Sequence, residues 1–597
     1  MSENNDVFQF INATYLKENY QKDGNSFTKV ADDALIVAYK KNGEQLLQVI
    51  ENPKFTFQVA KPDVQLQYNV DNIPNDKTDS VSIFYHDLNK TLAEISGKEE
   101  AYFRLKRDRN ASWQDKRQFE SMLQANPRLF GSDIHIEDHY KINFVTKYGV
   151  NIGGYKKGVF DIETDGKGNG VIDPHAAKDP VYCLSYYDFT TDRMYVLIWD
   201  QPERFKTLHI LKESINNGSF LQKIRDDEEM NGEFEIRTSK DHKPPKMVNT
   251  KTEYIFEFYE QEFDLLCRFY EIIHTLVPDF VLAWNFSFDN LTMINRLRHY
   301  EELDHSFRVE DIVCDQNVPP KYRTIHFKED MSPTAEYYNK WHWFTIPGRT
   351  VYLCSMAMYA HIRKSQGVLP SYALNDVCEK ELKKGKYDYH DIAEDVLDLP
   401  HVDFETSVFY NIKDTWLLAC LESKHNDIDQ IMYMAECTRL PQVTKQTAVV
   451  KNAQYMFYAQ KGLAMGNNIN AITDQPTMKY DGALVADPNL NEAILTPLYT
   501  FPIKTIRPYI SDNDLSSMYP SIAISHNIYK TTLIFHMVKI GTVNPFQDSP
   551  GVFEISDLMD NLQCRQYTRW GHDYLHLPDT DQLTKEIALA MQISIPD

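Results

Sequence analysis

The chain has 597 residues, of which 42% are hydrophobic and 25% are charged, so it is long enough to bury several cores. Its net charge of −23 repels a polyanion at long range, which excludes a protein that coats nucleic acid nonspecifically and leaves only local contacts with DNA. The eight cysteines form no C-x-x-C pair and no cluster of zinc spacing. There is no leader-like start and no run of about 18 apolar residues, so we expect a reduced, cytoplasmic protein that does not enter a membrane.

The order of strand-like and helical patterns predicts a multidomain protein of mixed α/β and α+β class. Short alternating runs such as ALIVAYKK predict a β-rich N-terminal domain over 1–154, in which the basic stretch 98–117 is typical of a solvated helix face. Alternating strands and helices predict an α/β domain over 155–426. A polar segment at about 305–345 is interpreted as an insertion of unassigned role within it. A helical connector over 427–475 then returns to the N-terminal domain, and a new domain occupies 476–597.

The first chemical signal is GVFDIET, which begins at Gly158. In a strand, the period of two puts Asp161 and Glu163 on one face. Two carboxylates that close raise one another's pKa unless a cation lies between them, so a divalent metal with oxygen ligands is the simplest partner. For this motif alone, a solvated strand edge is an equally good interpretation.

Two further segments carry acidic residues at helical positions. Asn285 and Asp289 follow an apolar strand and open an amphipathic helix, although Asp289 taken alone could be a helix N-cap. Tyr410 and Asp414 lie at i and i+4 of another helix and therefore share a face, although they could equally form a surface pair.

Taken in order, D-x-E, N-x-x-F-D and Y-x-x-x-D resemble the Exo I, Exo II and Exo III motifs of the proofreading exonucleases of family B DNA polymerases. The resemblance implies a ribonuclease H-like 3′–5′ exonuclease domain. It also implies two Mg²⁺ or Mn²⁺ ions held by Asp161, Glu163, Asp289 and Asp414. Tyr410 would orient the attacking water, and Asn285 and Phe288 would contact DNA. The spacing from Asn285 to Asp289 is one residue shorter than in most cellular and T-even-type enzymes and also resembles the protein-primed branch. Residues 370–386 resemble the T-even phage type.

The segment DLSSMYPS, which begins at Asp514, resembles polymerase motif A, with Met518 in place of Leu. The resemblance implies that Asp514 and the carbonyl of Leu515 bind Mg²⁺ in a polymerase site. The nucleotide would be contacted by the residues that follow, which are Ser516, Ser517, Met518 and Tyr519. The segment YDGALV, which contains Tyr480 and Gly482, resembles a motif that follows the template strand, although an ordinary strand entering the palm would look the same.

The polymerase site is incomplete in this sequence. The fingers motif K-x-x-x-N-S-x-Y-G is absent, and Asp579-Thr580-Asp581 is interpreted as a helix cap and not as the second catalytic motif D-T-D. We therefore expect a partial palm with the start of the fingers, which needs a separate C-terminal polypeptide carrying motifs B and C. A naturally split polymerase is favoured over a truncated one.

The expected partners of the chain are primer–template DNA, single-stranded DNA and that C-terminal polypeptide, with a sliding clamp as a further candidate. The competing hypothesis is a non-catalytic module that binds nucleic acid and regulates a polymerase. Metal distinguishes the two hypotheses, because a binding module should bind equally in EDTA whereas a nuclease should lose activity there.

Overall fold

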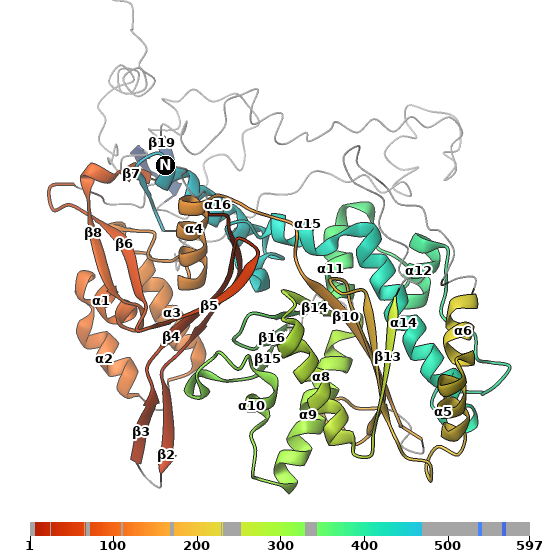
Figure 1. Ribbon diagram of the computed structural model, residues 1–597. Helices are drawn as coiled ribbons and strands as arrows, with labels where there is room; N and C mark the ends of the chain where they lie inside the picture. The colour runs from red at the N-terminus through yellow and green to blue at the C-terminus, as the bar shows by residue number, and fades with distance from the viewer. Residues whose placement is uncertain are drawn as a thin grey trace, which may run out of the picture. The chain divides into compact units, whose positions relative to one another are not determined.

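Figure 1 shows the computed structural model of the chain. The structure describes residues 6–23, 26–64, 66, 72–108, 111–167, 172–227, 230, 252–328, 343–467, 535–539 and 564–568. The chain divides into two compact units, each built from separate stretches. The first comprises Met1–Phe55, Ser82–Leu88 and Ile134–Gln460, and the second comprises Thr56–Val81, Asn89–Asp133 and Lys461–Asp597.

The first unit begins with antiparallel strands, which confirms the predicted β-rich N-terminal region. Strands β1 (Phe8–Leu16), β4 (Ala34–Lys41) and β5 (Glu44–Glu51) form a sheet in that order, and β2 (Asn19–Asp23) pairs with β3 (Ser26–Ala31). Asn42 and Gly43 join β4 to β5 with φ angles of 53° and 84°. An Asn-Gly pair with positive φ at both positions is the preferred two-residue hairpin turn. This two-residue turn fixes the register of the β4–β5 pair.

The centre of the first unit is a six-stranded mixed sheet in the order β13-β12-β11-β10-β14-β17. Strand β10 pairs antiparallel with β11 and parallel with β14, so it lies inside the sheet. The predicted α/β layer over 155–426 is therefore present as a mixed sheet with helices. The strands are β10 (Lys157–Thr164), β11 (Val181–Asp188), β12 (Arg193–Trp199), β13 (Glu253–Tyr259), β14 (Phe280–Ala283) and β17 (Val351–Cys354).

Helices cover both faces of this sheet (Figure 1). On one face the ring of Phe160 in β10 lies 5.0 Å from that of Phe269 in α8 (Glu262–Leu276). On the other face its neighbour Asp161 is bonded to Asn411 in α14 (Phe404–His425). Because successive strand residues point to opposite faces, α8 packs on the apolar side of β10 and α14 covers its acidic side.

The remaining elements of the first unit are mostly helices that flank the sheet. They are α4 (Ile136–Tyr148), α5 (Leu208–Asn217), α6 (Ser219–Asp226), α9 (Phe286–Leu303), α10 (Val309–Val313), η3 (Pro320–Tyr322), β15 (His326–Lys328), β16 (Trp343–Thr345), α11 (Ser355–Ile362), η5 (Lys364–Gln366), α12 (Leu374–Leu382), α13 (Leu399–Val402), α15 (Asp427–Met434), η6 (Leu440–Gln442) and α16 (Gln446–Gln460).

The second unit contains small sheets and helices. A sheet of order β8-β6-β9 accompanies a pair of β7 with β18 and a pair of β19 with β20. The α2 helix has no buried residue, as expected of the solvated basic stretch. These elements are β6 (Lys54–Ala60), β7 (Asn72–Pro74), η1 (Asn75–Lys77), β8 (Thr78–Phe84), η2 (Tyr85–Asp87), α1 (Leu88–Ile95), α2 (Glu99–Arg107), α3 (Trp113–Gln124), β9 (Leu129–Phe130), β18 (Leu463–Met465), β19 (Phe535–Lys539) and β20 (Cys564–Thr568). Of these elements, η2 belongs by its residues to the first unit, and β6, β8 and α1 are divided between the two units.

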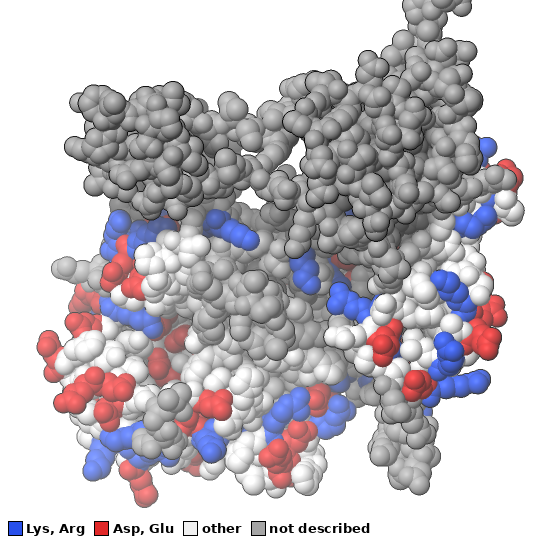
Figure 2. All heavy atoms as spheres, turned by 180° about the vertical axis from the view of Figure 1, so that it is seen from behind, with Lys and Arg blue, Asp and Glu red and all other residues white. Residues whose placement is uncertain are grey.

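Most of the predicted palm lies outside the described residues. From residue 468 onward only 535–539 and 564–568 are described, so the partial palm and the start of the fingers over 476–597 stay predictions. No helix in the described part of the chain combines the length and apolar character needed to cross a bilayer. On the face drawn in Figure 2, basic and acidic side chains are intermingled over the described part of the surface.

One buried carboxylate, Asp279, ties the N-terminal strands to the central sheet. Its side chain is fully buried, forms an ion pair with Lys40 of β4 and accepts a hydrogen bond from Gln45 of β5. It also accepts a hydrogen bond of 2.7 Å from the backbone N–H of Lys156, directly before β10. Three segments that are distant in sequence therefore meet at one carboxyl group.

We predict that Asp279→Ala strongly destabilises the first unit. Lys40 would remain buried without its carboxylate, and breaking a buried pair in this way costs about 3–5 kcal/mol. Urea denaturation followed by circular dichroism measures the loss. The matched control is Lys41→Ala, because the neighbouring Lys41 is exposed, and its pair with Asp6 and its contact with the Phe8 ring lie at the surface. Equal unfolding midpoints for the two variants would contradict this account of Asp279.

Candidate active site

Three carboxylates converge between the central sheet and the helix that covers it. Asp161 and Glu163 project from β10 and Asp414 from α14, and oxygen atoms of all three lie within 4.8 Å of one another. Two alternate residues of one strand share a face, and the helix packed on that face supplies the third acid. The structure thus brings together the first and third acidic segments of the sequence, which are some 250 residues apart.

The local sequence explains why α14 presents Asp414 there. Asp403 caps the helix, because its side chain accepts a hydrogen bond of 3.1 Å from the N–H of Thr406. Small polar residues then hold the middle of the helix against β11. Ser185 Oγ lies 3.1 Å from the carbonyl oxygen of Asn411 and 2.5 Å from Thr415 Oγ1. This close contact fixes the turn of α14 that carries Asp414.

Asp289 lies beside these three carboxylates, in the first turn of α9. The N-cap of that helix is Asn285, whose carbonyl oxygen accepts a 3.0 Å hydrogen bond from the N–H of Asp289, so the interpretation of Asp289 as the cap is wrong. Its side chain is only 2% exposed. Asp161 and Glu163 are close enough to raise the pKa of Asp289 after the larger effect of burial. Asp289 therefore lies near the two strand acids, although it is not part of the cluster of three whose oxygens lie within 4.8 Å of one another.

Burial raises the pKa of all four carboxyl groups, and repulsion by neighbouring carboxylates adds to it for Asp161, Glu163 and Asp289. Burial, then the Asp414 carboxylate, raises the pKa of Asp161 to about 8. Burial, then Asp161 and Asp414, raises the pKa of Glu163 well above its usual value, and burial also raises the pKa of Asp414. Two buried oxygens, Asp289 Oδ2 and Asp414 Oδ1, have no hydrogen-bond partner among the described residues. A group of acids this poorly solvated needs further positive charge to be fully ionised.

Lys386 supplies part of that positive charge. The sequence motifs did not identify it as a site residue. Its Nζ lies 2.5 Å from Asp414 Oδ2 and donates to the Tyr410 hydroxyl oxygen at 3.0 Å. Burial alone would lower the pKa of Lys386, but Asp414 and Tyr410 outweigh it and raise the pKa well above its usual value. Lys386 ends the segment 370–386 that was singled out by resemblance, so its position was visible although its contacts were not.

Asn411 is the second residue that the sequence analysis missed. Its Nδ2 donates a 2.9 Å hydrogen bond to Asp161 Oδ2, and its Oδ1 accepts a weaker one from Cys183 Sγ at 3.4 Å. The side chain is fully buried. Because an amide with both ends bonded cannot easily rotate, Asn411 fixes one oxygen of Asp161. Its place directly after Tyr410 in a helix is the only sequence signal for this role.

The residues present fit a divalent cation. The carboxyl groups outnumber the ammonium groups near them, which are Lys386, bonded to Asp414, and Lys413, whose charge also acts on Asp414 while it lies 3.7 Å from Asp227. All candidate ligands are oxygen atoms, which Mg²⁺ and Mn²⁺ prefer, and two of them are buried without a partner. Cation binding would therefore satisfy both the unpaired oxygens and the charge imbalance.

The other predicted site residues are less informative. Phe288 is partly buried and packs against the main core, and Asn285 occupies the turn between β14 and α9. The residues of the predicted polymerase half-site lie outside the described part of the chain, namely Tyr480, Gly482, Asp514, Leu515, Ser516, Ser517, Met518 and Tyr519.

Comparison with known proteins shows what this region is similar to. Residues 128–377 match the protein family described as DNA polymerase family B, exonuclease domain. This region is similar to the exonuclease domain of family B DNA polymerases. The match contains Asp161, Glu163 and Asp289 and ends before Lys386 and α14. An exonuclease domain of this family implies the use of divalent metal, in agreement with the carboxylates that the structure groups together.

Individual proteins that are similar to the chain are also named as DNA polymerases. The chain is 25% identical over 289 residues to the DNA polymerase delta catalytic subunit of Drosophila melanogaster, covering 46% of this chain and 23% of that protein. It is 26% identical over 313 residues to the same subunit of Dictyostelium discoideum, covering 49% and 25%. It is 22% identical over 383 residues to the DNA-directed DNA polymerase of Escherichia phage RB69, covering 63% and 35%. The matched part thus spans about a quarter to a third of the relatives' length.

We predict that Mg²⁺ stabilises the protein more at pH 8 than at pH 5. The pKa of Asp161 is about 8 in the folded protein and 3.8 in the unfolded chain. Without metal, the contribution of Asp161 to the free energy of unfolding is therefore present at low pH and is lost as pH rises from about 4 to 8. Mg²⁺ binds the ionised form and reverses that loss, whereas protons compete with it at pH 5. Thermal unfolding in EDTA and in Mg²⁺ at both pH values measures the effect. A Mg²⁺-induced rise in melting temperature that is equal at both pH values would contradict the prediction.

Proposed function

We propose that this chain is a 3′–5′ exonuclease that hydrolyses the terminal phosphodiester bond of single-stranded DNA with two divalent cations, Mg²⁺ or Mn²⁺. The observation that carries the proposal is the cluster of Asp161, Glu163 and Asp414, with the buried Asp289 near it and one unpartnered oxygen each on Asp289 and Asp414. Most of these acids lie in a region that matches the exonuclease domain of family B DNA polymerases. Purely structural burial of so many carboxylates would be costly, because each must be either neutralised or paired.

Each residue of the site has a distinct part in the proposed mechanism. Asp161, Glu163, Asp289 and Asp414 hold the cations, which when bound activate water and stabilise the negative charge of the leaving oxygen. Burial raises the pKa of Tyr410, so its hydroxyl stays protonated. Because Lys386 donates to the Tyr410 oxygen, the phenolic hydrogen is left to orient the attacking water. Asn411 keeps Asp161 in its rotamer.

We infer a wider role from motif A. With Asp514 to Tyr519 as half of a polymerase site, the chain would be the N-terminal part of a family B replicative polymerase, completed by a C-terminal polypeptide with motifs B and C. The nuclease would then proofread primer ends, and the domain boundaries near 155, 427 and 476 would separate its parts. Support for this role comes from the sequence and from the relatives named as DNA polymerases.

The first test removes the strand carboxylates. We predict that Asp161→Ala/Glu163→Ala lowers degradation of a 5′-labelled single strand in Mg²⁺ by at least about 100-fold, because the loss of activating charge at a reacting centre costs about 2.7–4 kcal/mol or more. The control Glu253→Ala/Glu271→Ala also removes two carboxylates, from exposed positions in the same unit. It should degrade DNA at the wild-type rate. Degradation that persists in the first variant, or in EDTA, would remove the nuclease assignment and favour the non-catalytic binding module.

The second test separates the two effects of Lys386. We predict that Lys386→Met cleaves about tenfold more slowly, because Tyr410 loses the donor that orients it. The same variant should bind Mn²⁺ more tightly in the absence of DNA, because the ammonium group no longer competes for Asp414. Single-turnover cleavage and a Mn²⁺ titration followed by electron paramagnetic resonance measure the two effects.

Lys380→Met is the matched control for this pair of measurements, since Lys380 is half-exposed and has only a loose 3.7 Å contact with Glu381. It should change neither quantity. If Lys386→Met weakens Mn²⁺ binding and cleavage together, Lys386 supports the fold of the site and does not act in the proposed way.

A further inference from the structure

Asp289 differs from Asp161 and Asp414 in how its side chain is held. Asn411 donates a hydrogen bond to Asp161, and Lys386 is bonded to Asp414. Asp289 Oδ2 has no hydrogen-bond partner among the described residues, and Asp289 is not one of the three acids whose oxygens lie within 4.8 Å of one another. The distance of this carboxylate from the strand acids therefore depends on how α9, the helix that carries it, is placed and rotated.

A buried ion pair restrains the rotation of α9. Arg296 lies seven residues after Asp289, and therefore on the same face of the helix, about 10 Å further along its axis. Arg296 is 7% exposed, and its Nε donates a 2.9 Å hydrogen bond to Oε1 of Glu262, which is 1% exposed at the start of α8. Its Nη2 donates to the other carboxylate oxygen of Glu262. Because two nitrogens of the fork meet both oxygens, the pair fixes an orientation as well as a distance.

The same pair is bonded to the sheet that carries the other acids. Glu262 Oε1 also accepts a 2.8 Å hydrogen bond from the backbone N–H of Val181, the first residue of β11. Arg296 Nη1 donates a 2.9 Å hydrogen bond to the carbonyl oxygen of Ala177, which lies between β10 and β11. Strand β11 is the antiparallel neighbour of β10. The ion pair therefore holds α9 in a defined position relative to the strand of the two carboxylates.

Small rotations of α9 would matter for metal binding. A side-chain end lies about 5 Å from a helix axis, so a rotation of about 20° moves it by roughly 2 Å. Metal–ligand distances vary by only about 0.2 Å. The hydrophobic effect is not directional, whereas the guanidinium fork is. The pair of Arg296 with Glu262 is therefore the contact suited to keep Asp289 within reach of a cation.

We propose that the ion pair of Arg296 with Glu262 positions Asp289 and so determines whether the second of two cations binds. Arg296 is a positioning residue and touches no cation itself, because it lies two turns along α9 from Asp289. The inference rests on the proposed function, since it takes Asp289 as a ligand of a two-cation site. The first cation, held by the cluster of three acids, does not depend on the pair.

The test is a Mn²⁺ titration of the full chain without DNA, followed by electron paramagnetic resonance. The wild type should bind two ions. Arg296→Met should bind the first ion within about twofold of the wild type and the second at least about tenfold more weakly. Because this change leaves Glu262 buried without its partner, Glu262→Gln/Arg296→Met is measured as well. That variant buries no unpaired charge, so it should fold, and it should show the same loss of the second ion.

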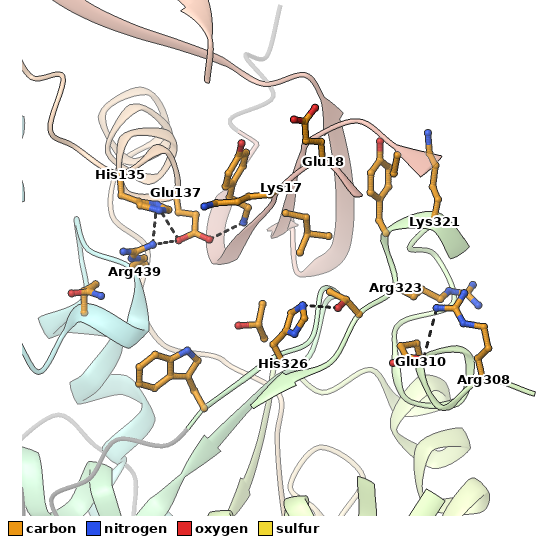
Figure 3. A pocket seen from close by; sticks show the side chains of 18 residues that line it. Lys17, Glu18, His135, Glu137, Arg308, Glu310, Lys321, Arg323, His326 and Arg439 are labelled. Atoms are coloured by element: carbon orange, nitrogen blue, oxygen red, sulfur yellow. Dashed lines mark hydrogen bonds and ion pairs between the residues drawn. The ribbon is translucent and has the colours of Figure 1, made fainter. Parts of the chain in front are cut away.

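Two other arginine pairs of the first unit provide matched controls. Arg363 forms hydrogen bonds of 3.0 and 2.8 Å with Asp427, and both side chains are 10% exposed. Arg439 is 2.6 Å from Glu137 beside a cavity of about 690 Å³, shown in Figure 3, whose described lining includes none of the four acids. Arg363→Met and Arg439→Met should both lower the melting temperature, yet bind both ions within about twofold of the wild type.

A double-mutant cycle separates positioning from a general loss of stability. In the background of Asp289→Asn, which weakens the second ion directly, Arg296→Met should change second-ion binding by less than about twofold. Cleavage of a 5′-labelled strand gives an independent readout. Arg296→Met should need at least about tenfold more Mn²⁺ for half of its maximal rate and should approach the wild-type rate at saturating Mn²⁺.

The outcomes distinguish this inference from the function on which it rests. The inference is overturned if Arg296→Met and Glu262→Gln/Arg296→Met bind both ions as the controls do, or if the effects of Arg296→Met and Asp289→Asn add in full. Either result leaves the nuclease assignment standing when the wild type binds two ions and degrades DNA. A wild type that binds no Mn²⁺ and degrades no DNA overturns the proposed function and this inference together.

Discussion

Repulsion between buried carboxylates is the constraint on which the rest of this structure depends. Asp161, Glu163 and Asp414 bring their oxygens within 4.8 Å of one another where burial weakens screening, and Asp289 adds a fourth charge beside them. The protein answers with one ammonium group from Lys386 and one amide donor from Asn411. These two groups compensate only part of the negative charge. The pKa values of Asp161 and Glu163 therefore stay above their usual values. A site in this condition is poised for a cation.

The fold places these groups with elements that come from widely separated parts of the chain. Strand β10 lies inside the sheet and cannot shift its register without moving Asp161 and Glu163 to the apolar face that packs on α8. Helix α14 is held on the opposite face by small polar contacts with β11. The family match ends at residue 377, so Asp414, Tyr410 and Lys386 lie beyond it. The structure therefore shows what the family match does not, namely that Asp414, Tyr410 and Lys386 lie with Asp161 and Glu163 in one site.

Sequence periodicity predicted the parts of the site that depend on one element at a time. The period of two put Asp161 and Glu163 on one face, and the i, i+4 spacing put Tyr410 and Asp414 on another, because both follow from backbone geometry alone. The α/β layer and the β-rich N-terminal region followed from the same kind of pattern, whereas the antiparallel pairing of β10, β11 and β12 did not. Lys386 and Asn411 could not be found in this way, since their contacts depend on how the segment after α12 and the helix α14 pack in three dimensions.

The central claim is that the four acids are a binding site for divalent cations, and crystallography with Mn²⁺ tests it most directly. Crystals grown in Mn²⁺ and measured at its absorption edge locate the ion by anomalous scattering. The account predicts anomalous peaks within bonding distance of Asp161, Glu163 and Asp414, with Lys386 displaced from Asp414 Oδ2. A map with no peak among these carboxylates at saturating Mn²⁺, and with the ammonium group of Lys386 still bonded to Asp414, would contradict it.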